Sequence, residues 1–122
     1  MTTFPEIPFP LTGDRVRIEA ADGDGGYAIV RLADDVAVGQ LRLEVEADQL
    51  TVCSLCIEVA YRGYGCGSEA GWLLVQASES RGRLRAWAPP DRGLAVYYWI
   101  RMGLRPLPGK GPGGGIWFER RR

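Results

Sequence analysis

The first half of the chain carries a pattern of apolar and polar positions that predicts a series of strands. Charged and apolar residues alternate over residues 15–20, as they do on a half-buried strand. Residues 27–32 and 36–46 are two further segments of strand length, and the aspartates and glycines of residues 22–26 predict a turn between the first two strands. Residues 50–59 are rich in apolar and β-branched side chains, which predicts a central strand after these antiparallel neighbours.

The second half of the chain predicts two helices with a strand between them. A first helix is expected over residues 65–80, and Arg81 and Gly82 supply the cation and the glycine that helix C-termini favour. Residues 83–88 predict a short strand that runs parallel to the central one, because a helix connects the two. Asp91 then stands where it can cap the second helix.

The end of the chain completes the expected fold. The apolar and aromatic residues of the second helix are expected to pack in the core; they are Leu94, Tyr97, Tyr98, Trp99, Ile100 and Met102. Residues 106–115 predict a flexible loop that either caps a site or simply connects a hairpin, and residues 116–120 predict the last strand. The prolines of residues 1–13 predict an extended arm. These elements predict one α+β domain over residues 1–122, built on a mixed α/β sheet.

Composition agrees with one globular domain and excludes several kinds of chemistry. The 122 residues are 46% hydrophobic and 25% charged, which is enough apolar material for a core. The formal net charge is zero, which argues against binding of nucleic acid by bulk electrostatics. The absence of histidine excludes Ser-His, Cys-His and His-metal sites. No apolar run predicts a signal peptide or a membrane span, so no membrane partner is expected.

The three cysteines are expected to stay reduced in the cytoplasm. An odd number of cysteines without a signal peptide is typical of such a chain. Cys53 and Cys56 form a CxxC pattern, but on a strand this odd offset sends the two side chains to opposite faces. We therefore expect both to be small core residues rather than metal or redox groups, and we expect no metal site.

A glycine-rich turn follows the predicted central strand and is the candidate for a binding site. Arg62 is followed by Gly63, Gly65 and Gly67, which let the backbone turn sharply and leave no Cβ between the amides and a ligand. The helix that begins there has N–H groups without partners inside the helix, and its dipole places partial positive charge at this end. The turn therefore suits a phosphate-bearing ligand. The alternative is a tight strand-to-helix connection without a ligand.

Two common nucleotide-binding loops fit this turn poorly. A P-loop needs a lysine after its glycines, and none follows here. A dinucleotide-binding loop has a third glycine where Ser68 stands, and an acidic residue after the next strand, which here is followed by Pro89 and Pro90. That fold also alternates strands and helices, whereas the first half of this chain predicts antiparallel strands. A nucleotide-phosphate binder is therefore the third of the interpretations considered.

The turn and the strand before it resemble a known family. Residues 62–67 are Arg-Gly-Tyr-Gly-Cys-Gly, which resembles the R/Q-x-x-G-x-G/A signature of the GCN5-related N-acetyltransferases. In that family the amides of the turn hold the pyrophosphate of acetyl-CoA, and the strand before it usually has Val or Ile where Ile57 stands. The residues that the resemblance assigns to the cofactor are Ile57, Val59, Arg62, Gly63, Tyr64, Gly65, Cys66, Gly67, Ser68 and Arg92.

A second segment extends the resemblance. Residues 95–104 are similar to the family's A-i-x-l-Y-x-k-l-G-F helix, with Ala95, Gly103 and Leu104 at matching positions. The resemblance covers residues 36–119 and implies the acyl-CoA N-acyltransferase fold, in which the central strand and its parallel neighbour splay apart to admit the pantetheine arm. It also implies acetyl-CoA as a co-substrate and an amine acceptor, either a small molecule or a protein.

The chain departs from the family before its central strand. The family usually has two helices between its first two strands, where they wall the acceptor side, whereas only residues 22–26 lie between the corresponding strands here. We therefore expect a short member that lacks these helices. Three arrangements remain open for the missing wall: an open groove, the proline-rich arm, or a second subunit in a homodimer.

The resemblance implies direct attack of the acceptor amine on the acetyl-CoA thioester, with a backbone N–H of residues 57–59 polarising the carbonyl. Many family members use a tyrosine four residues before the glycine that ends the second helix as the acid. Here that position is Trp99, so Tyr98 and Tyr97 are the nearest candidates. The acids nearest to the place of the family's base are Glu44, Glu46 and Glu58.

Two functions of different classes follow from the sequence. The first is an N-acetyltransferase that transfers an acetyl group from acetyl-CoA to an amine. The alternative is a CoA-binding or acyl-CoA-binding module on the same fold, with little or no catalysis, which the missing tyrosine, base and helices favour.

Overall fold

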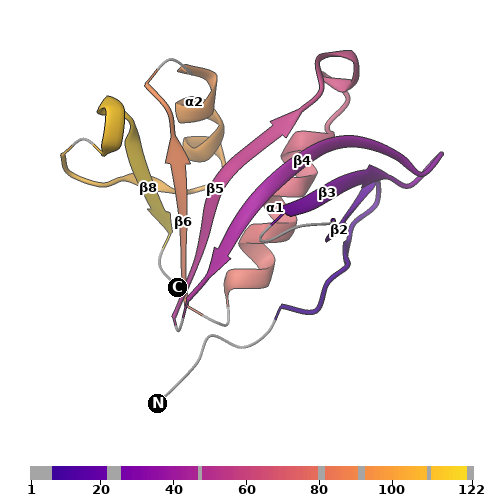
Figure 1. The fold of residues 1–122 in the computed structure, drawn as a ribbon, viewed down its shortest axis with the longest axis horizontal. Coiled ribbons are helices and arrows are strands. Elements are labelled where there is room, and N and C mark those ends of the chain that lie inside the picture. Colours follow the sequence, from indigo (N-terminus) through magenta and orange to yellow (C-terminus); the bar gives the residue numbers. More distant parts are fainter. Residues whose placement is uncertain are drawn as a thin grey trace.

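The computed structural model describes residues 7–21, 26–46, 48–79, 82–90, 93–109 and 111–120 (Figure 1). In these residues the elements are β1 (Leu11–Thr12), β2 (Val16–Ala20), β3 (Gly26–Arg31), β4 (Val36–Val45), β5 (Gln49–Ile57), η1 (Val59–Tyr61), α1 (Cys66–Glu79), β6 (Arg83–Ala88), α2 (Gly93–Arg101), β7 (Arg105–Pro106), η2 (Pro112–Gly114) and β8 (Ile116–Arg120). Several predictions lie wholly or partly outside them: the arm over 1–13, the turn over 22–26, Arg81 as a helix end, Asp91 as a cap, and Arg92.

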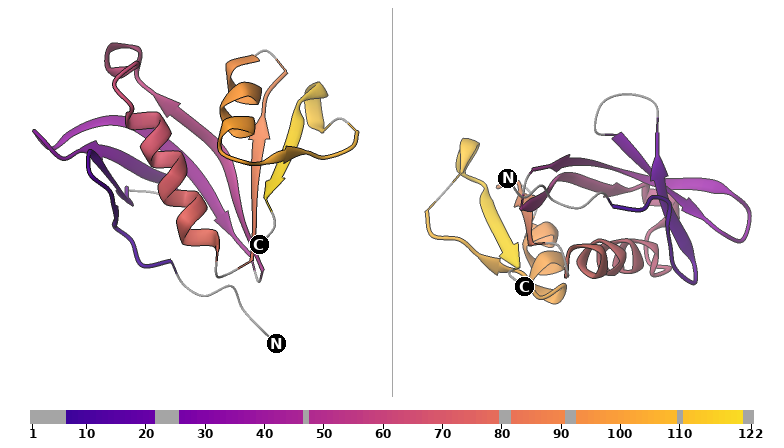
Figure 2. Two further views of the ribbon diagram at one scale, coloured as in Figure 1. Left: turned by 180° about the vertical axis from the view of Figure 1, so that it is seen from behind. Right: turned by 90° about the horizontal axis from the view of Figure 1, so that it is seen from below.

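The strands form one mixed sheet in the order β1-β2-β3-β4-β5-β6-β8-β7. Among the strands of the described residues, only β5 and β6 pair in parallel, as predicted from the helix between them. Figure 2 shows α1 and α2 on the same side of this sheet. Both α-helices of the described residues follow β5, and residues 21–25 are too few to hold two helices between β2 and β3. The predicted α+β class and the lack of early helices are therefore confirmed.

An extra residue on β5 keeps one face of the sheet apolar. The pairing of β4 with β5 steps from Arg42–Ser54 to Leu43–Val52, so Cys53 has no partner of its own on β4. A β-bulge of this kind shifts the alternation of side chains by one residue. As a result, the apolar side chains before and after the bulge share one face; they are Leu50, Val52, Leu55 and Ile57.

The hydrophobic core lies between this face of the sheet and the two helices. Its fully buried members come from α1 and from strands across the sheet, and they include Val16, Ile18, Ile29, Leu41, Leu50, Leu74, Val75, Leu84 and Phe118. Burial of each such side chain stabilises the fold by about 1.5–3 kcal/mol relative to exposure. This packing fixes α1 against the sheet, and with it the position of the turn that precedes the helix.

The expectation that Cys53 and Cys56 are core residues is wrong. Cys53 is half-buried and Cys56 is exposed, whereas Cys66 is buried. The physical reason is the β-bulge on β5: Cys53 is its unpaired residue, and Cys56 lies opposite the exposed Gln40 of β4, on the face away from Leu55 and Ile57.

The expectation of core packing along α2 is correct for only one side of the helix. Trp99 is buried, and so is Met102, which comes directly after the last residue of α2. In contrast, Leu94, Tyr97 and Ile100 are exposed by 84%, 62% and 52%. These three residues recur every third position and so share one face of the helix. That face is turned away from the core, and α2 contacts β6 and β7 with its other side.

The described residues between 106 and 115 form a hairpin connection. β7 and β8 pair as antiparallel strands, and Leu107 N–H donates to the Trp117 carbonyl oxygen at 2.8 Å. Inside the connection, the Gly111 N–H donates to the Gly115 carbonyl oxygen at 2.8 Å. A Cβ on either glycine would collide with the ring of Trp87, so the glycines let this segment pack directly on that ring. Of the two interpretations of the segment, the hairpin is confirmed.

Tyr98 joins α2 to α1 through its hydroxyl group. The hydroxyl donates a hydrogen bond to the Gly67 carbonyl oxygen at 2.6 Å. A Cβ at Gly71 would collide with this hydroxyl and lie 2.8 Å from the Met102 sulfur. Glycine inside a helix costs up to about 1 kcal/mol relative to alanine. Here it allows the two helices to approach closely enough for the tyrosine to bond the backbone of α1.

We predict that Gly71→Ala lowers the free energy of unfolding by about 1–3 kcal/mol in urea denaturation, because the added methyl overpacks the contact between α1 and α2. Gly93→Ala is the matched control, since nothing lies within 4 Å of a Cβ there. It should leave the stability unchanged or raise it by up to about 1 kcal/mol.

The same contact predicts coupling between two substitutions. Tyr98→Phe removes the oxygen that the methyl of Gly71→Ala meets. The free energy of unfolding should therefore fall less in the double variant than the sum of the two decreases measured in the single variants. Strictly additive losses, or a stable Gly71→Ala protein, would contradict the proposed tie between the helices.

Candidate functional site

The site is built where β5 and β6 stop pairing. Their parallel ladder runs from Gln49–Arg83 to Val52–Ala86 and ends there, although β5 continues to Ile57 and β6 to Ala88. Figure 1 shows the two strands diverging beyond this point. The predicted splay of the parallel pair is therefore confirmed. It leaves backbone N–H and C=O groups of β5 facing an opening instead of a strand.

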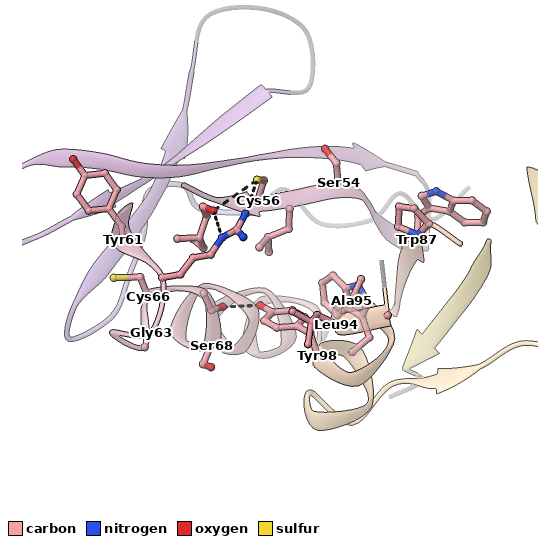
Figure 3. A pocket seen from close by; sticks show the side chains of 18 of the residues that line it. Ser54, Cys56, Tyr61, Gly63, Cys66, Ser68, Trp87, Leu94, Ala95 and Tyr98 are labelled. Carbon is pink, nitrogen blue, oxygen red and sulfur yellow. Dashed lines mark hydrogen bonds between the residues drawn. The ribbon is translucent and has the colours of Figure 1, made fainter. Parts of the chain in front are cut away.

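A cavity of 840 Å³ fills the opening. One wall is β5 over residues 53–57, one end is the glycine turn with the first residues of α1, and the other end carries Trp87, Leu94 and Tyr98. Figure 3 shows Ser54 and Cys56 on one side of this space and Ser68 and Tyr98 on the other. The volume lies within the range of about 300–1,000 Å³ that is typical of small-molecule sites.

The glycine turn has the geometry that the sequence predicts. Gly63 and Gly65 have φ angles of 89° and 84°, which other residues rarely adopt. α1 begins at Cys66, and the Glu69 N–H donates to the Gly65 carbonyl oxygen at 3.0 Å. The first N–H groups of a helix have no carbonyl partner within it. The turn therefore directs the amide end of α1 at the cavity, where negative charge is favoured.

Arg62 directs its side chain to β5. Its Nε donates to the Ile57 carbonyl oxygen at 2.8 Å, and its Nη2 lies 4.0 Å from the Cys56 sulfur. Figure 3 shows both contacts as dashed lines within the cavity. The guanidinium thus braces the end of β5 against the turn, and the backbone amides of the turn remain the groups that face a ligand.

The backbone of Ile57 points into the cavity. In an antiparallel ladder, successive residues direct their N–H and C=O groups to opposite sides of the strand. The Glu58 N–H donates to the Val38 carbonyl oxygen of β4 at 2.9 Å, so Glu58 faces β4. Ile57 faces the other way, which agrees with the hydrogen bond from Arg62 to its carbonyl. Of the residues expected to supply a carbonyl-polarising N–H, Ile57 therefore faces the cavity and Glu58 does not, while Val59 belongs to η1.

Of the candidate catalytic side chains, Tyr98 lines the cavity, whereas Tyr97 and Glu58 do not. Tyr98 lines the cavity, and burial raises the pKa of its hydroxyl, while the hydrogen bond from Gly71 acts in the opposite direction. Tyr97 lies outside the residues that line the cavity, and the Arg101 guanidinium lies 5.8 Å from its ring centroid. Glu58 is exposed and precedes η1. Trp99, at the position of the family's tyrosine, is buried and also lines the cavity.

Most of the residues expected to hold the cofactor meet at the cavity. Those that line it are Ile57, Arg62, Gly63, Gly65, Cys66, Gly67 and Ser68. Val59 and Tyr64 are exposed by 76% and 68% and do not line it, and Arg92 lies outside the described residues.

Sequence reasoning missed the far end of the cavity. Trp87 is the second-last residue of β6, and its ring packs 4.9 Å from that of Trp117, between centroids. An aromatic residue at the end of the predicted strand over 83–88 was the available signal. It did not mark a site because only the splay of β6 away from β5 turns this residue toward the opening.

The cysteines at the cavity behave as thiols in different surroundings. All three line the space. Burial raises the pKa of the Cys53 thiol, and the charge of Glu44 together with a hydrogen bond to that carboxylate raises it further, whereas Arg42 opposes the shift. Cys53 is therefore a neutral thiol, and the Glu44 carboxylate lies near this residue of the cavity wall.

Neither a metal centre nor a membrane span emerges from the part of the chain that the structure describes. Within it, no three His, Cys, Asp or Glu side chains gather closely enough to hold a metal ion. None of its helices combines the length and the apolar character that crossing a membrane requires.

Solved structures with the same arrangement of elements identify the fold. No protein-family model matches the sequence, and a search of curated proteins finds no match. A Vibrio cholerae protein named as a candidate ribosomal-protein-serine acetyltransferase superposes with a TM-score of 0.73 at 14% identity, over 100% of both chains. Arabidopsis thaliana Naa50, in complex with the bisubstrate analogue CoA-Ac-MVNAL, gives 0.65 at 14% identity, over 85% of this chain and 83% of that one.

A Bacillus anthracis acetyltransferase of the GNAT family gives a TM-score of 0.66 at 13% identity. The match covers 80% of this chain but only 66% of that protein, so the present chain spans about two thirds of its length. The candidate site of this chain depends on its splayed parallel pair, β5 and β6. The chain has the fold of the GCN5-related N-acetyltransferases.

Proposed function

We propose that the protein is an N-acetyltransferase that takes an acetyl group from acetyl-CoA and transfers it to an amine by direct attack. The observation that carries the proposal is the parting of β5 and β6 beyond Val52–Ala86, which opens a cavity from the glycine turn to Trp87. A cofactor with a diphosphate, an extended amide-containing arm and a thioester fits a cavity that begins at the glycine turn and follows the unpaired length of β5. Naa50, whose fold is similar, is bound to a CoA-based bisubstrate analogue.

Each part of the cavity has a proposed role toward acetyl-CoA. The amides of the turn and of the start of α1, over residues 63–68, bind the diphosphate. The free side of β5, over residues 53–57, pairs with the amides of the pantetheine arm, in the way that an added strand pairs with a sheet edge. Ile57 lies at the turn end of this wall, so the arm runs from there toward Cys53 and places the thioester farther along β5. A free backbone N–H of β5 there stabilises the negative charge that develops on the carbonyl oxygen during attack.

The reaction needs one proton removed and one supplied. The neutral acceptor nitrogen attacks the thioester carbon, the carbon–sulfur bond breaks, and the thiolate leaves and takes up a proton. Among the acids named from the sequence, Glu44 lies near enough to Cys53, a residue of the cavity wall, for its charge to raise the pKa of that thiol. Glu44, acting through water, is therefore our choice for the base over the exposed Glu58.

We choose Tyr98 as the proton donor rather than Tyr97, because Tyr98 lines the cavity and Tyr97 does not. Its raised pKa keeps the hydroxyl protonated at neutral pH. Its proton is engaged with the Gly67 carbonyl oxygen at 2.6 Å, so donation to the thiolate requires this bond to break first. Water is a sufficient substitute if the bond persists, because a CoA thiolate is a good leaving group.

The second candidate function is a CoA-binding module without efficient catalysis. The specific observation in its favour is that the Tyr98 hydroxyl is held by the backbone of α1, while Tyr97 and Glu58 lie outside the cavity lining. Both functions need the same cofactor site, so only an assay of transfer separates them.

The proposed activity is tested by incubating the protein with acetyl-CoA and panels of amino acids, polyamines and peptides with free N-termini. Products should be followed by mass, because the three cysteines of the protein would react with a thiol reagent. We expect protein-dependent acetylation within one of these classes of amine. Tight binding of acetyl-CoA without transfer to any amine would instead favour the binding module.

The cofactor site predicts a second outcome. Gly67→Glu should weaken the stabilisation of the protein against heat by acetyl-CoA, with affinity falling by ~100-fold or more, because a carboxylate would face the phosphates. A Cβ at Gly67 points at β5, 3.2 Å from the Ile57 side chain, and the residue has no positive φ. Gln76→Glu is the control, since Gln76 is an exposed residue of the same helix. Equal binding by both variants would remove the turn from the site.

A further inference from the structure

A second cavity lies behind the glycine turn. Its volume is 380 Å³, and it is lined by Asp14, Arg15 and Arg31 from the side of β2 and β3, and by Tyr64 and Cys66 from the turn. Cys66 also lines the larger cavity, so the two spaces meet at the start of α1. Neither Arg15 nor Arg31 belongs to the segment that carries the family signature.

Arg15 is held against the turn by its side chain. Its Nη1 donates to the Tyr64 carbonyl oxygen at 3.3 Å. A Cβ on Gly65 would collide with the same Nη1, so the guanidinium lies directly against the backbone of the turn. Gly65 therefore has two reasons to be glycine here: its φ of 84° and the room that it leaves for Arg15.

The backbone of Arg15 is held as well, by an acidic residue in the first turn of α1. The Glu69 Oε1 accepts hydrogen bonds from the Arg15 N–H at 2.8 Å and from the Val16 N–H at 3.4 Å. A Cβ at Gly13 would collide with this carboxylate, which lies close against the chain before β2. These contacts tie the start of β2 to α1, so little further order is needed for the guanidinium to meet a ligand at the turn.

The charge of Arg15 is the one in this cavity that no carboxylate neutralises. Arg31 forms an ion pair with Asp34 at 2.6 Å, and Arg17 forms pairs with Glu19 and Asp35 at 2.7 Å each. Arg15 forms no ion pair with the acidic side chains of the described residues. Asp14 lines the same cavity and opposes an anion there, so attraction of a negatively charged group depends on Arg15.

We propose that Arg15 binds a phosphate group of the nucleotide end of coenzyme A in this second cavity, and this rests on the proposed function. The turn carries the diphosphate on the side of the larger cavity, and Arg15 lies on its other side. A cofactor that passes the start of α1 brings its nucleotide phosphates to the guanidinium, whose planar donors suit phosphate oxygens. The ligand chemistry is a phosphate, either of the diphosphate or the 3′-phosphate on the ribose.

The test is the affinity of 3′,5′-ADP, a probe that contains the nucleotide end and lacks the pantetheine arm. Arg15→Gln should weaken its binding about tenfold, the effect of losing one charge-assisted hydrogen bond near the surface. Arg17→Gln is the matched control, because it removes the same charge two residues further along, within β2, and Arg17 does not line the cavity. Arg15→Lys should restore part of the loss, since an ammonium still attracts phosphate.

Each outcome decides the proposal. An unchanged affinity for 3′,5′-ADP in a folded Arg15→Gln protein, or an equal loss in Arg17→Gln, would overturn the role of Arg15. If that happens while the wild type still binds acetyl-CoA, the proposed function stands; if the wild type binds neither compound, both proposals fail. A comparison of CoA with dephospho-CoA assigns the phosphate, because a loss confined to CoA identifies the 3′-phosphate.

A second variant covers the case in which Arg15→Gln does not fold. Asp14→Asn removes the negative charge of the same cavity and keeps the arginine. It should tighten binding of 3′,5′-ADP by about twofold, as expected for an exposed charge. Weaker binding in this variant would contradict a phosphate site at Arg15.

Discussion

The structure depends on the point at which β5 and β6 stop sharing hydrogen bonds. Up to Val52–Ala86 the two strands form a parallel ladder, and beyond this pair they diverge. The unpaired length of β5 would be costly if it were covered by apolar groups, because backbone N–H and C=O groups need partners. It is instead the wall of a cavity, with the amide end of α1 at one end and Trp87 at the other. A fold that leaves backbone groups available in this way is built to receive an extended ligand that can pair with them.

The opening is maintained by contacts that surround it. The bulge at Cys53 turns Leu55 and Ile57 toward the core, so that β5 stays anchored after it has lost β6. Tyr98 joins α2 to α1 across the cavity, and Glu69 joins α1 to the start of β2. As the sequence predicts, the described residues hold no helix between β2 and β3, and these contacts fix the turn and both helices in place. Because Glu69 holds the start of β2 against α1, Arg15 also lies against the turn, although it is outside the family signature.

Sequence reasoning recovered the parts of the molecule whose signals are local. Three spaced glycines and an apolar strand before them predicted the turn, and a helix between two strands predicted the parallel pair. It failed where the outcome depends on contacts between distant segments. The bulge at Cys53 arises from its pairing with β4, so the side of each cysteine could not be read from spacing alone. The exposure of one face of α2 and the contact of Arg15 with Tyr64 likewise depend on how whole elements are placed.

We infer that the cavity between β5 and β6 is a site for acetyl-CoA. The most direct test is a calorimetric titration of the folded protein with acetyl-CoA, with ATP and NAD as controls that carry phosphates but no pantetheine arm. We expect saturable binding of acetyl-CoA in the micromolar range, about −8 kcal/mol, and much weaker binding of both controls. Equal binding of all three would reduce the site to a general phosphate site. The absence of heat with acetyl-CoA, in a protein shown to be folded, would contradict the account.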